Sequence, residues 1–265
     1  NEPTLQYIRD SWLMAMAEMD SKQRATWEAI YDKKNEEFLK NPPVGKDLLR
    51  WKYQRYVKEY CRTIRSVDEQ VGRLLDYLEE KGVLDNTVIV YTSDQGFLLG
   101  EHGLYDKRFM YEESFRTPLI ISCPSLVKKH SVCKELVQNI DLAPTFLSLA
   151  GVEVPKEMSG RSLLPLFKNG KAENWRNELY YHFYDYPAVG SVRKHDGIRT
   201  KRYKLIHWYG EGSGNDEAID FWELYDLKKD VMEVNNVYDN PKYVKVREAL
   251  TVQLEKLRKD VGVTE

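Results

Sequence analysis

Cysteine is scarce in this chain of 265 residues, which contains only Cys61, Cys123 and Cys133. Their odd number and irregular spacing offer no pairing typical of a metal site. A chain of this length can bury enough apolar surface to fold without cross-links. We therefore expect Cys61 and Cys123 to be plain buried thiols.

Net charge and long apolar runs are lacking as well. The 40 basic side chains nearly balance the 42 acidic ones, so nothing indicates a nucleic-acid or anionic-membrane partner. No apolar run approaches the length of a membrane span. The first residues, Asn1-Glu-Pro-Thr4, resemble neither a signal peptide nor an initiator methionine, so the compartment is left open.

A short β-branched and aromatic run at residues 87–92 predicts a buried strand of an α/β sheet. Ligands of such sheets bind beyond the carboxyl ends of the strands, where Ser93, Asp94, Gln95 and Gly96 follow. A carboxylate beside an amide carbonyl suits a hard cation such as Ca²⁺ or Mg²⁺. The same residues are also ordinary turn formers, so this pair alone leaves both interpretations open.

Helical periodicity dominates the first half of the chain. Residues 10–39 predict one or two amphipathic helices that end at Pro42-Pro43, and residues 47–81 predict a long helix that Gly82 closes. Residues 118–123 predict a second buried strand, and residues 139–151 an N-capped helix in which Asp141 serves the cap. His102, in a charged loop, either bonds locally or faces the cleft.

The composition changes after Gly170. Aromatic, alternating runs at residues 178–186, 192–200, 202–209 and 221–227 predict a small antiparallel sheet, and residues 242–259 predict a last helix. The sequence therefore indicates an α/β fold in two parts. Residues 1–170 would form part of a large mixed-sheet domain sandwiched by helices, and residues 171–265 a small α+β subdomain with an antiparallel sheet and a C-terminal helix.

The longer motif series resembles the sulfatase family of the alkaline-phosphatase superfamily. Its pieces follow in order: Val67-Asp-Glu-Gln-Val-Gly-Arg-Leu-Leu-Asp-Tyr-Leu78, Asp85-Asn-Thr-Val-Ile-Val-Tyr-Thr-Ser-Asp-Gln-Gly96, Leu99-Gly-Glu-His-Gly103, Lys107, Arg116-Thr-Pro-Leu-Ile-Ile121, Asp141-Leu-Ala-Pro-Thr145, and Gly151-Val152 with Ser159-Gly-Arg-Ser-Leu-Leu-Pro-Leu-Phe167. The resemblance implies that Asp94 and Gln95 hold Ca²⁺ or Mg²⁺ and that Lys107 holds the sulfate ester. The family usually has Asn or His where this chain has Gln95.

Residues 186–200 resemble the corresponding segment of glucosamine-6-sulfatases. That resemblance implies a sulfated-glycan substrate, N-acetylglucosamine-6-sulfate above all, with His195 and Arg199 beside a glycine turn at the rim of the cleft. It also favours a periplasmic or secreted location. Either residue could instead belong to a solvated hairpin turn.

The family's nucleophile motif, which matures to formylglycine, is not found in this sequence, and neither is its Asp-Asp metal pair. Cys123-Pro124 does not match the nucleophile motif, because Pro follows Cys directly and the Arg of the motif is absent. We therefore expect the chain to be the C-terminal half of a sulfatase, inactive alone, with the missing half or a second chain as partner. The alternatives are a phosphoesterase or phosphonate hydrolase of the same superfamily, and a non-catalytic interaction module.

Overall fold

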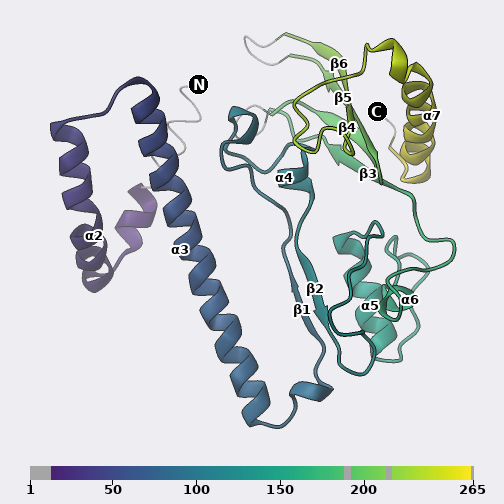
Figure 1. The fold of residues 1–265 in the computed structure, drawn as a ribbon, viewed down its shortest axis with the longest axis horizontal. Coiled ribbons are helices and arrows are strands. Elements are labelled where there is room, and N and C mark those ends of the chain that lie inside the picture. The colour runs from purple at the N-terminus through teal and green to yellow at the C-terminus, as the bar shows by residue number, and fades with distance from the viewer. Residues whose placement is uncertain (1–12, 188–191, 213–216, 264–265) are drawn as a thin grey trace. The chain divides into compact units, whose positions relative to one another are not determined.

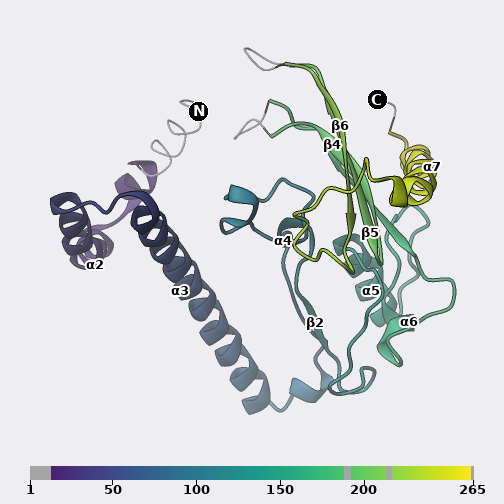
Figure 2. The same ribbon diagram turned by 45° about the horizontal axis from the view of Figure 1, so that its top comes forward.

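The computed structural model describes residues 13–187, 192–212 and 217–263 (Figures 1 and 2). The chain divides into two compact units, one built on the residues up to Asp76 and the other on residues 77–187 and 192–265. Each unit is described by itself. The boundary predicted at residue 170 falls inside the second unit and stays a prediction.

The first unit consists of helices, as the periodicity predicts. Residues 13–18 are helical, α2 spans Ser21–Lys40 and α3 spans Gly45–Glu80. Asp20 caps α2 by accepting the backbone N–H of Gln23 at 2.8 Å. The two long helices are joined by the Tyr31 hydroxyl, which donates to Glu59 at 2.7 Å, and by stacked rings of Phe38 and Trp51.

Helix α3 runs for 36 residues and buries none of them. Its apolar side chains recur at helical spacing but remain exposed, as at Tyr53, Ile64 and Leu74. Cys61 lies on the same helix and is exposed, so the prediction of a buried thiol is wrong there. Cys123, at the end of a strand, is buried as predicted.

Two short strands open the second unit. After the 3-10 turn η1 (Leu84–Asn86), β1 (Ile89–Thr92) pairs antiparallel with β2 (Leu119–Ser122). Both strands are confirmed, but their predicted burial is wrong. Within the described residues they form a two-stranded sheet, and side chains such as Ile120 lie in solvent.

Short helices connect and support this ribbon. The chain continues through η2 (Glu101–Gly103) and α4 (Glu112–Phe115), and after β2 through η3 (Asn139–Asp141), α5 (Leu142–Leu149) and α6 (Leu164–Phe167). Leu163, Leu166 and Phe167 form a core against which Leu119 and Ile121 of β2 pack. The helices α5 and α6 therefore hold the ribbon from one side.

The four-stranded sheet has the order β3-β4-β5-β6, with every neighbouring pair antiparallel. Its strands are β3 (Glu178–Phe183), β4 (His195–Thr200), β5 (Tyr203–Gly210) and β6 (Ile219–Asp226), followed by η5 (Pro241–Tyr243) and α7 (Val244–Asp260). Leu250 and Leu254 of α7 pack on one face. Met110 and Tyr111 pack on the other. The predicted subdomain is confirmed, and no helix in the described ranges is long and apolar enough to cross a membrane.

The glycine turn predicted beside His195 and Arg199 is wrong. Gly197 lies inside β4, opposite Tyr181 of β3 and Ile206 of β5. A Cβ at Gly197 would stand 2.6 Å from the sulfur of Met110, so the glycine allows the segment around Met110 to approach the sheet. Residues 188–191 of the segment lie outside the described residues.

His195 is fully buried, so the prediction that it lies at a cleft rim is also wrong. Its ring stacks on Trp208, with centroids 4.1 Å apart, and Nδ1 lies 2.9 Å from the carbonyl of Arg193. The buried Nε2 has no hydrogen-bond partner among the described residues. Burial lowers the pKa of the imidazole to about 4, because the charged form would lose its hydration.

Asp141 has a wider role than the predicted cap. Its fully buried carboxylate accepts the backbone N–H groups of Gln138 and Arg161, each at 2.8 Å. The guanidinium of Arg176 donates to both carboxylate oxygens, to Oδ1 at 2.7 Å. Asp141 therefore connects three segments that are distant in sequence.

We expect Asp141→Asn to lower the free energy of unfolding by about 3 to 5 kcal/mol, because it leaves the buried Arg176 cation without its counter-charge. The matched control is Glu255→Gln, which removes a half-exposed carboxylate paired with Arg258 and should cost no more than about 1 kcal/mol. Urea unfolding followed by circular dichroism measures both. Equal losses in the two variants would contradict the structural role of Asp141.

We expect stability to fall as the pH drops from about 6.5 toward 4, because His195 takes up its proton in the unfolded chain before it does so in the folded one. His195→Phe should lessen that fall by about 2 kcal/mol. The exposed His130→Asn should leave it unchanged. Urea unfolding of each variant at pH 6.5 and 4.5 is the measurement, and an undiminished fall in His195→Phe would refute the assignment.

Candidate active site

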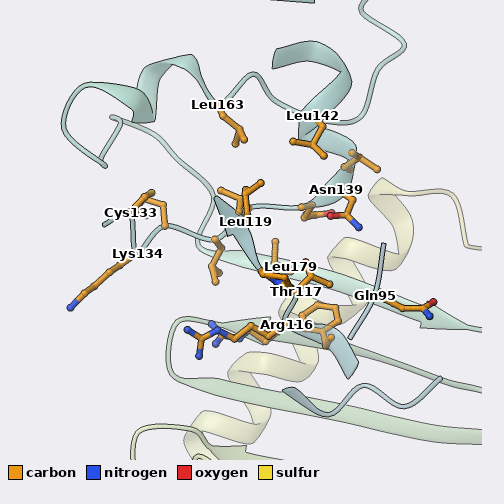
Figure 3. A pocket seen from close by; sticks show the side chains of 18 of the residues that line it. Gln95, Arg116, Thr117, Leu119, Cys133, Lys134, Asn139, Leu142, Leu163 and Leu179 are labelled. Carbon is orange, nitrogen blue, oxygen red and sulfur yellow. The ribbon is translucent and has the colours of Figure 1, made fainter. Parts of the chain in front are cut away.

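An open groove of about 1500 Å³ lies within the second unit (Figure 3). Asp94, Gln95, Lys107 and Arg199 all line it. His195 does not. The structure therefore brings together the predicted metal ligands, the predicted sulfate-binding lysine and one predicted substrate-binding residue.

The turn that carries Asp94 and Gln95 follows β1 directly. The Ser93 hydroxyl donates to the carbonyl of Gln95 at 2.7 Å and closes the turn. The Asn139 amide donates to the carbonyls of Ser93 and Asp94, at 3.2 and 2.9 Å. These bonds fix the backbone, while the Asp94 side chain remains exposed.

Gly96 presses this turn against the end of another segment. Its N–H donates to the carbonyl of Ser114 at 2.7 Å. A Cβ at Gly96 would lie 1.9 Å from the carbonyl oxygen of Glu113, so no side chain fits here without movement of the backbone.

The loop that carries Lys107 is fixed in a similar way. The Asp106 carboxylate accepts the N–H groups of Lys107 and Arg108, at 2.5 and 2.8 Å, and the Arg108 guanidinium at 2.7 Å. The Ser114 hydroxyl donates to the carbonyl of Lys107. The Lys107 residue is exposed at the groove.

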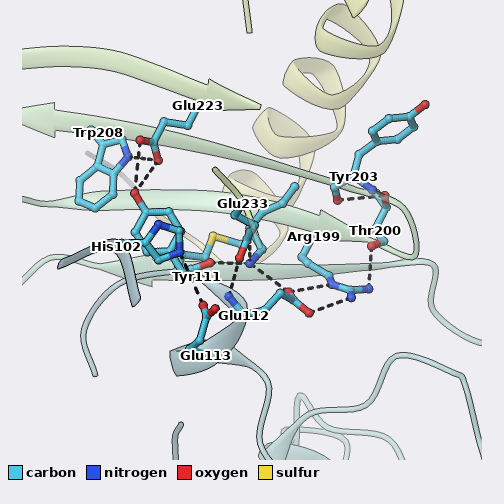
Figure 4. A network of polar contacts seen from close by, with 12 residues as sticks. His102, Tyr111, Glu112, Glu113, Arg199, Thr200, Tyr203, Trp208, Glu223 and Glu233 are labelled. Carbon is cyan, nitrogen blue, oxygen red and sulfur yellow. Dashed lines mark hydrogen bonds and ion pairs between the residues drawn. The ribbon is translucent and has the colours of Figure 1, made fainter. Parts of the chain in front are cut away.

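Arg199 reaches the groove with its charge already paired. Its guanidinium donates to Glu112 Oε2 at 3.1 Å and to the carbonyl of Thr200 at 2.8 Å (Figure 4). Glu112 also contacts Lys204. The substrate-binding role of Arg199 stays a prediction, and its contacts favour a part in holding Glu112.

His102 does not line the groove. Its ring stacks on Tyr111 with centroids 4.2 Å apart, and Nε2 lies 3.8 Å from a carboxylate oxygen of Glu113 (Figure 4). These contacts support the interpretation of His102 as a loop residue that interacts locally.

Ser114, Glu112 and Asn139 were not identified as site residues from the sequence. Asn139 bonds to carbonyls 45 and 46 residues away in the chain, and Arg199 lies 87 residues from Glu112. Sequence periodicity carries no signal for contacts at that separation. The sequence predicts Asn139 only as part of a helix start.

The donor chemistry of Asp94 and Gln95 fits a hard cation, since both offer oxygen. Two oxygens nevertheless fall short of the six or more that such a cation takes. Across the described residues no group of three or more His, Cys, Asp or Glu side chains could hold a metal ion. A complete metal site would need ligands beyond those that these residues supply.

Comparisons with known proteins agree on one family. The family described as "Sulfatase" matches residues 17–152, and the family described as "N-sulphoglucosamine sulphohydrolase, C-terminal" matches residues 100–260. An N-acetylglucosamine-6-O-sulfatase of Bacteroides thetaiotaomicron is 49% identical over 243 residues, which are 91% of this chain and 42% of that protein.

One further relative and a solved structure extend the comparison. The multifunctional alkaline phosphatase superfamily protein PehA of Trinickia caryophylli is 35% identical, over 69% of this chain and 36% of that protein. A structure solved in complex with its substrate D-glucosamine-2-N,6-O-disulfate superposes with a TM-score of 0.88 at 45% identity, covering 100% of this chain and 53% of that one. The chain thus spans about half the length of these relatives or less, and it belongs to the sulfatase family.

Proposed function

We propose that this chain contributes Lys107, Asp94 and Gln95 to the active site of a sulfatase that hydrolyses a sulfate ester on a glucosamine residue of a glycan. The observation that carries the proposal is the groove, which gathers these three residues from two separate loops. The 49% identical N-acetylglucosamine-6-O-sulfatase supports the substrate class.

Lys107 would act on the sulfate group. Its ammonium is a compact charge at the groove surface, and its backbone is fixed by Asp106 and Ser114. In that position it would neutralise sulfate oxygens and the charge that develops on the bridging oxygen as the ester bond breaks. Such preorganised charge is commonly the largest single contribution to catalysis.

Asp94 and Gln95 would hold the expected Ca²⁺ or Mg²⁺ together with ligands from outside this sequence. When bound, a divalent cation polarises the oxygens of a sulfate ester. The carboxylate of Asp94 supplies the anionic oxygen, and Gln95 a neutral carbonyl. The turn at Ser93 and the amide of Asn139 would keep both residues at the groove.

The nucleophile, expected to be formylglycine, would also come from outside these 265 residues. Cys123 does not fit that role in the structure. It is buried at the end of β2, and its carbonyl accepts the N–H groups of Leu126 and Val127 in a tight turn.

A phosphoesterase or phosphonate hydrolase is the second candidate, favoured by the 35% identity to a multifunctional alkaline phosphatase superfamily protein. A phosphate monoester carries two negative charges and a sulfate ester one, so a site with fewer cations favours sulfate. The ratio of kcat/KM for 4-nitrophenyl sulfate and for 4-nitrophenyl phosphate separates the two candidates. A ratio below one would favour the phosphoesterase.

In a full-length form that supplies the proposed nucleophile, we expect Lys107→Ala to lower kcat on an aryl sulfate about a hundredfold or more, the usual result of removing one preorganised stabilising group. The exposed Lys129→Ala, outside the groove, is the matched control and should keep its rate. Melting temperatures should agree among the three proteins. An unchanged kcat in Lys107→Ala would remove this lysine from the site.

The 265-residue chain alone should not hydrolyse aryl sulfates, because a nucleophile and a closed metal site act as a unit and losing one removes orders of magnitude of rate. It should also bind Ca²⁺ weakly, since Asp94 and Gln95 supply two protein oxygens. Calorimetry with CaCl₂ and an aryl-sulfate assay on protein of confirmed mass are the measurements. Clear turnover by this chain would mean that the nucleophile lies within it.

A further inference from the structure

We infer that Ser114 is a positioning residue that joins the turn carrying Asp94 and Gln95 to the Lys107 loop. The four-stranded sheet holds Ser114 in place through Glu112. The inference rests on the proposed function, because it concerns how the groove residues are kept in register. It assigns a task in that site to α4 and to the four-stranded sheet.

Ser114 makes two hydrogen bonds, one to each of the two loops. Its carbonyl accepts the N–H of Gly96 at 2.7 Å, and its hydroxyl donates to the carbonyl of Lys107. Ser114 is 5% exposed, so water cannot readily replace either bond. One buried residue thus contacts the residue after Gln95 and the backbone of Lys107.

The contacts of Glu112 hold α4, the helix on which Ser114 lies, in place. Glu112, two residues earlier, accepts the Arg199 guanidinium and lies 3.0 Å from the ammonium of Lys204. Its backbone N–H donates to Glu233 at 2.7 Å. Although burial raises it, Lys204 and Arg199 bring the pKa of Glu112 below its usual value, so this carboxylate stays charged in the ion pairs.

This arrangement would position the ammonium of Lys107 for catalysis. A charge that stabilises a transition state must be held within about half an ångström of its productive position. The long side chain of Lys107 is flexible, so its backbone sets where the ammonium can reach. Without the Ser114 hydroxyl the loop would keep its fold through Asp106, whose carbonyl also accepts the N–H of Leu98. The carbonyl of Lys107, however, would lose its bond to α4.

The experiment compares Ser114→Ala, Ser114→Thr and Ser148→Ala in the full-length form that supplies the proposed nucleophile. Ser148 is the matched control, because its hydroxyl also donates to a backbone carbonyl, that of Pro144 at 2.8 Å, but in α5. For each variant, kcat and KM are measured on an aryl sulfate. Hydrogen exchange of residues 104–110 is measured by mass spectrometry on the same proteins.

We expect Ser114→Ala to lower kcat about tenfold to a hundredfold with little change in KM, and to speed exchange in residues 104–110, in line with the sensitivity of catalysis to small misplacements. Ser114→Thr keeps the hydroxyl and should restore most of kcat. Ser148→Ala should match the wild type. Unchanged kcat in Ser114→Ala, or a loss that Thr does not restore, overturns the inference.

If Ser114→Ala does not fold, Glu112→Gln tests the same connection. It should lower kcat about threefold to tenfold at unchanged KM and speed exchange in residues 104–110, and no change in either overturns the inference. The Lys107→Ala variant separates the two proposals. If it retains turnover, the proposed function fails; if it is inactive while Ser114→Ala is fully active, only the inference fails.

Discussion

A buried ammonium, that of Lys204, is the charge around which the second unit is arranged. The side chain is fully buried, so its charge must be compensated by protein groups. It donates to the carbonyl of Met110 and forms an ion pair with Glu233, whose Oε1 lies 2.7 Å away. Glu112 completes the set.

The groups that compensate the charge of Lys204 come from segments that are distant in sequence. Lys204 comes from β5, and Met110 precedes α4. Glu112 comes from α4 and Glu233 from the segment after β6 (Figure 4). Burial raises the pKa of Glu233 above its usual value, whereas the pKa of Glu112 is lowered by Lys204 and Arg199 although burial opposes them. Buried ion pairs add little net stability, but they tolerate few alternative arrangements. Such a network suits a segment that holds the loops of the groove in fixed positions.

Local pattern was sufficient for the elements and insufficient for their surroundings. The strands of the C-terminal sheet, α3 and α7 follow from periodicity, and the motif series places Asp94 and Lys107 at one groove. Local pattern predicts the wrong burial for Cys61 and His195, because the burial of each depends on which elements pack against its helix or strand. Local pattern predicts a turn at Gly197, whereas this glycine lies in β4 and allows the close approach of Met110. Contacts across more than 80 residues, as between Arg199 and Glu112, leave no trace in local spacing.

The missing side chain at Gly96 has a consequence for how this protein can vary. Ala would already place a carbon inside the van der Waals radius of the Glu113 carbonyl, so the position tolerates a single amino acid. The turn at Gln95 can therefore lie this close to α4 only because Gly96 has no Cβ. Changes elsewhere in the groove can alter its charge or shape gradually, but this contact can only be kept or lost.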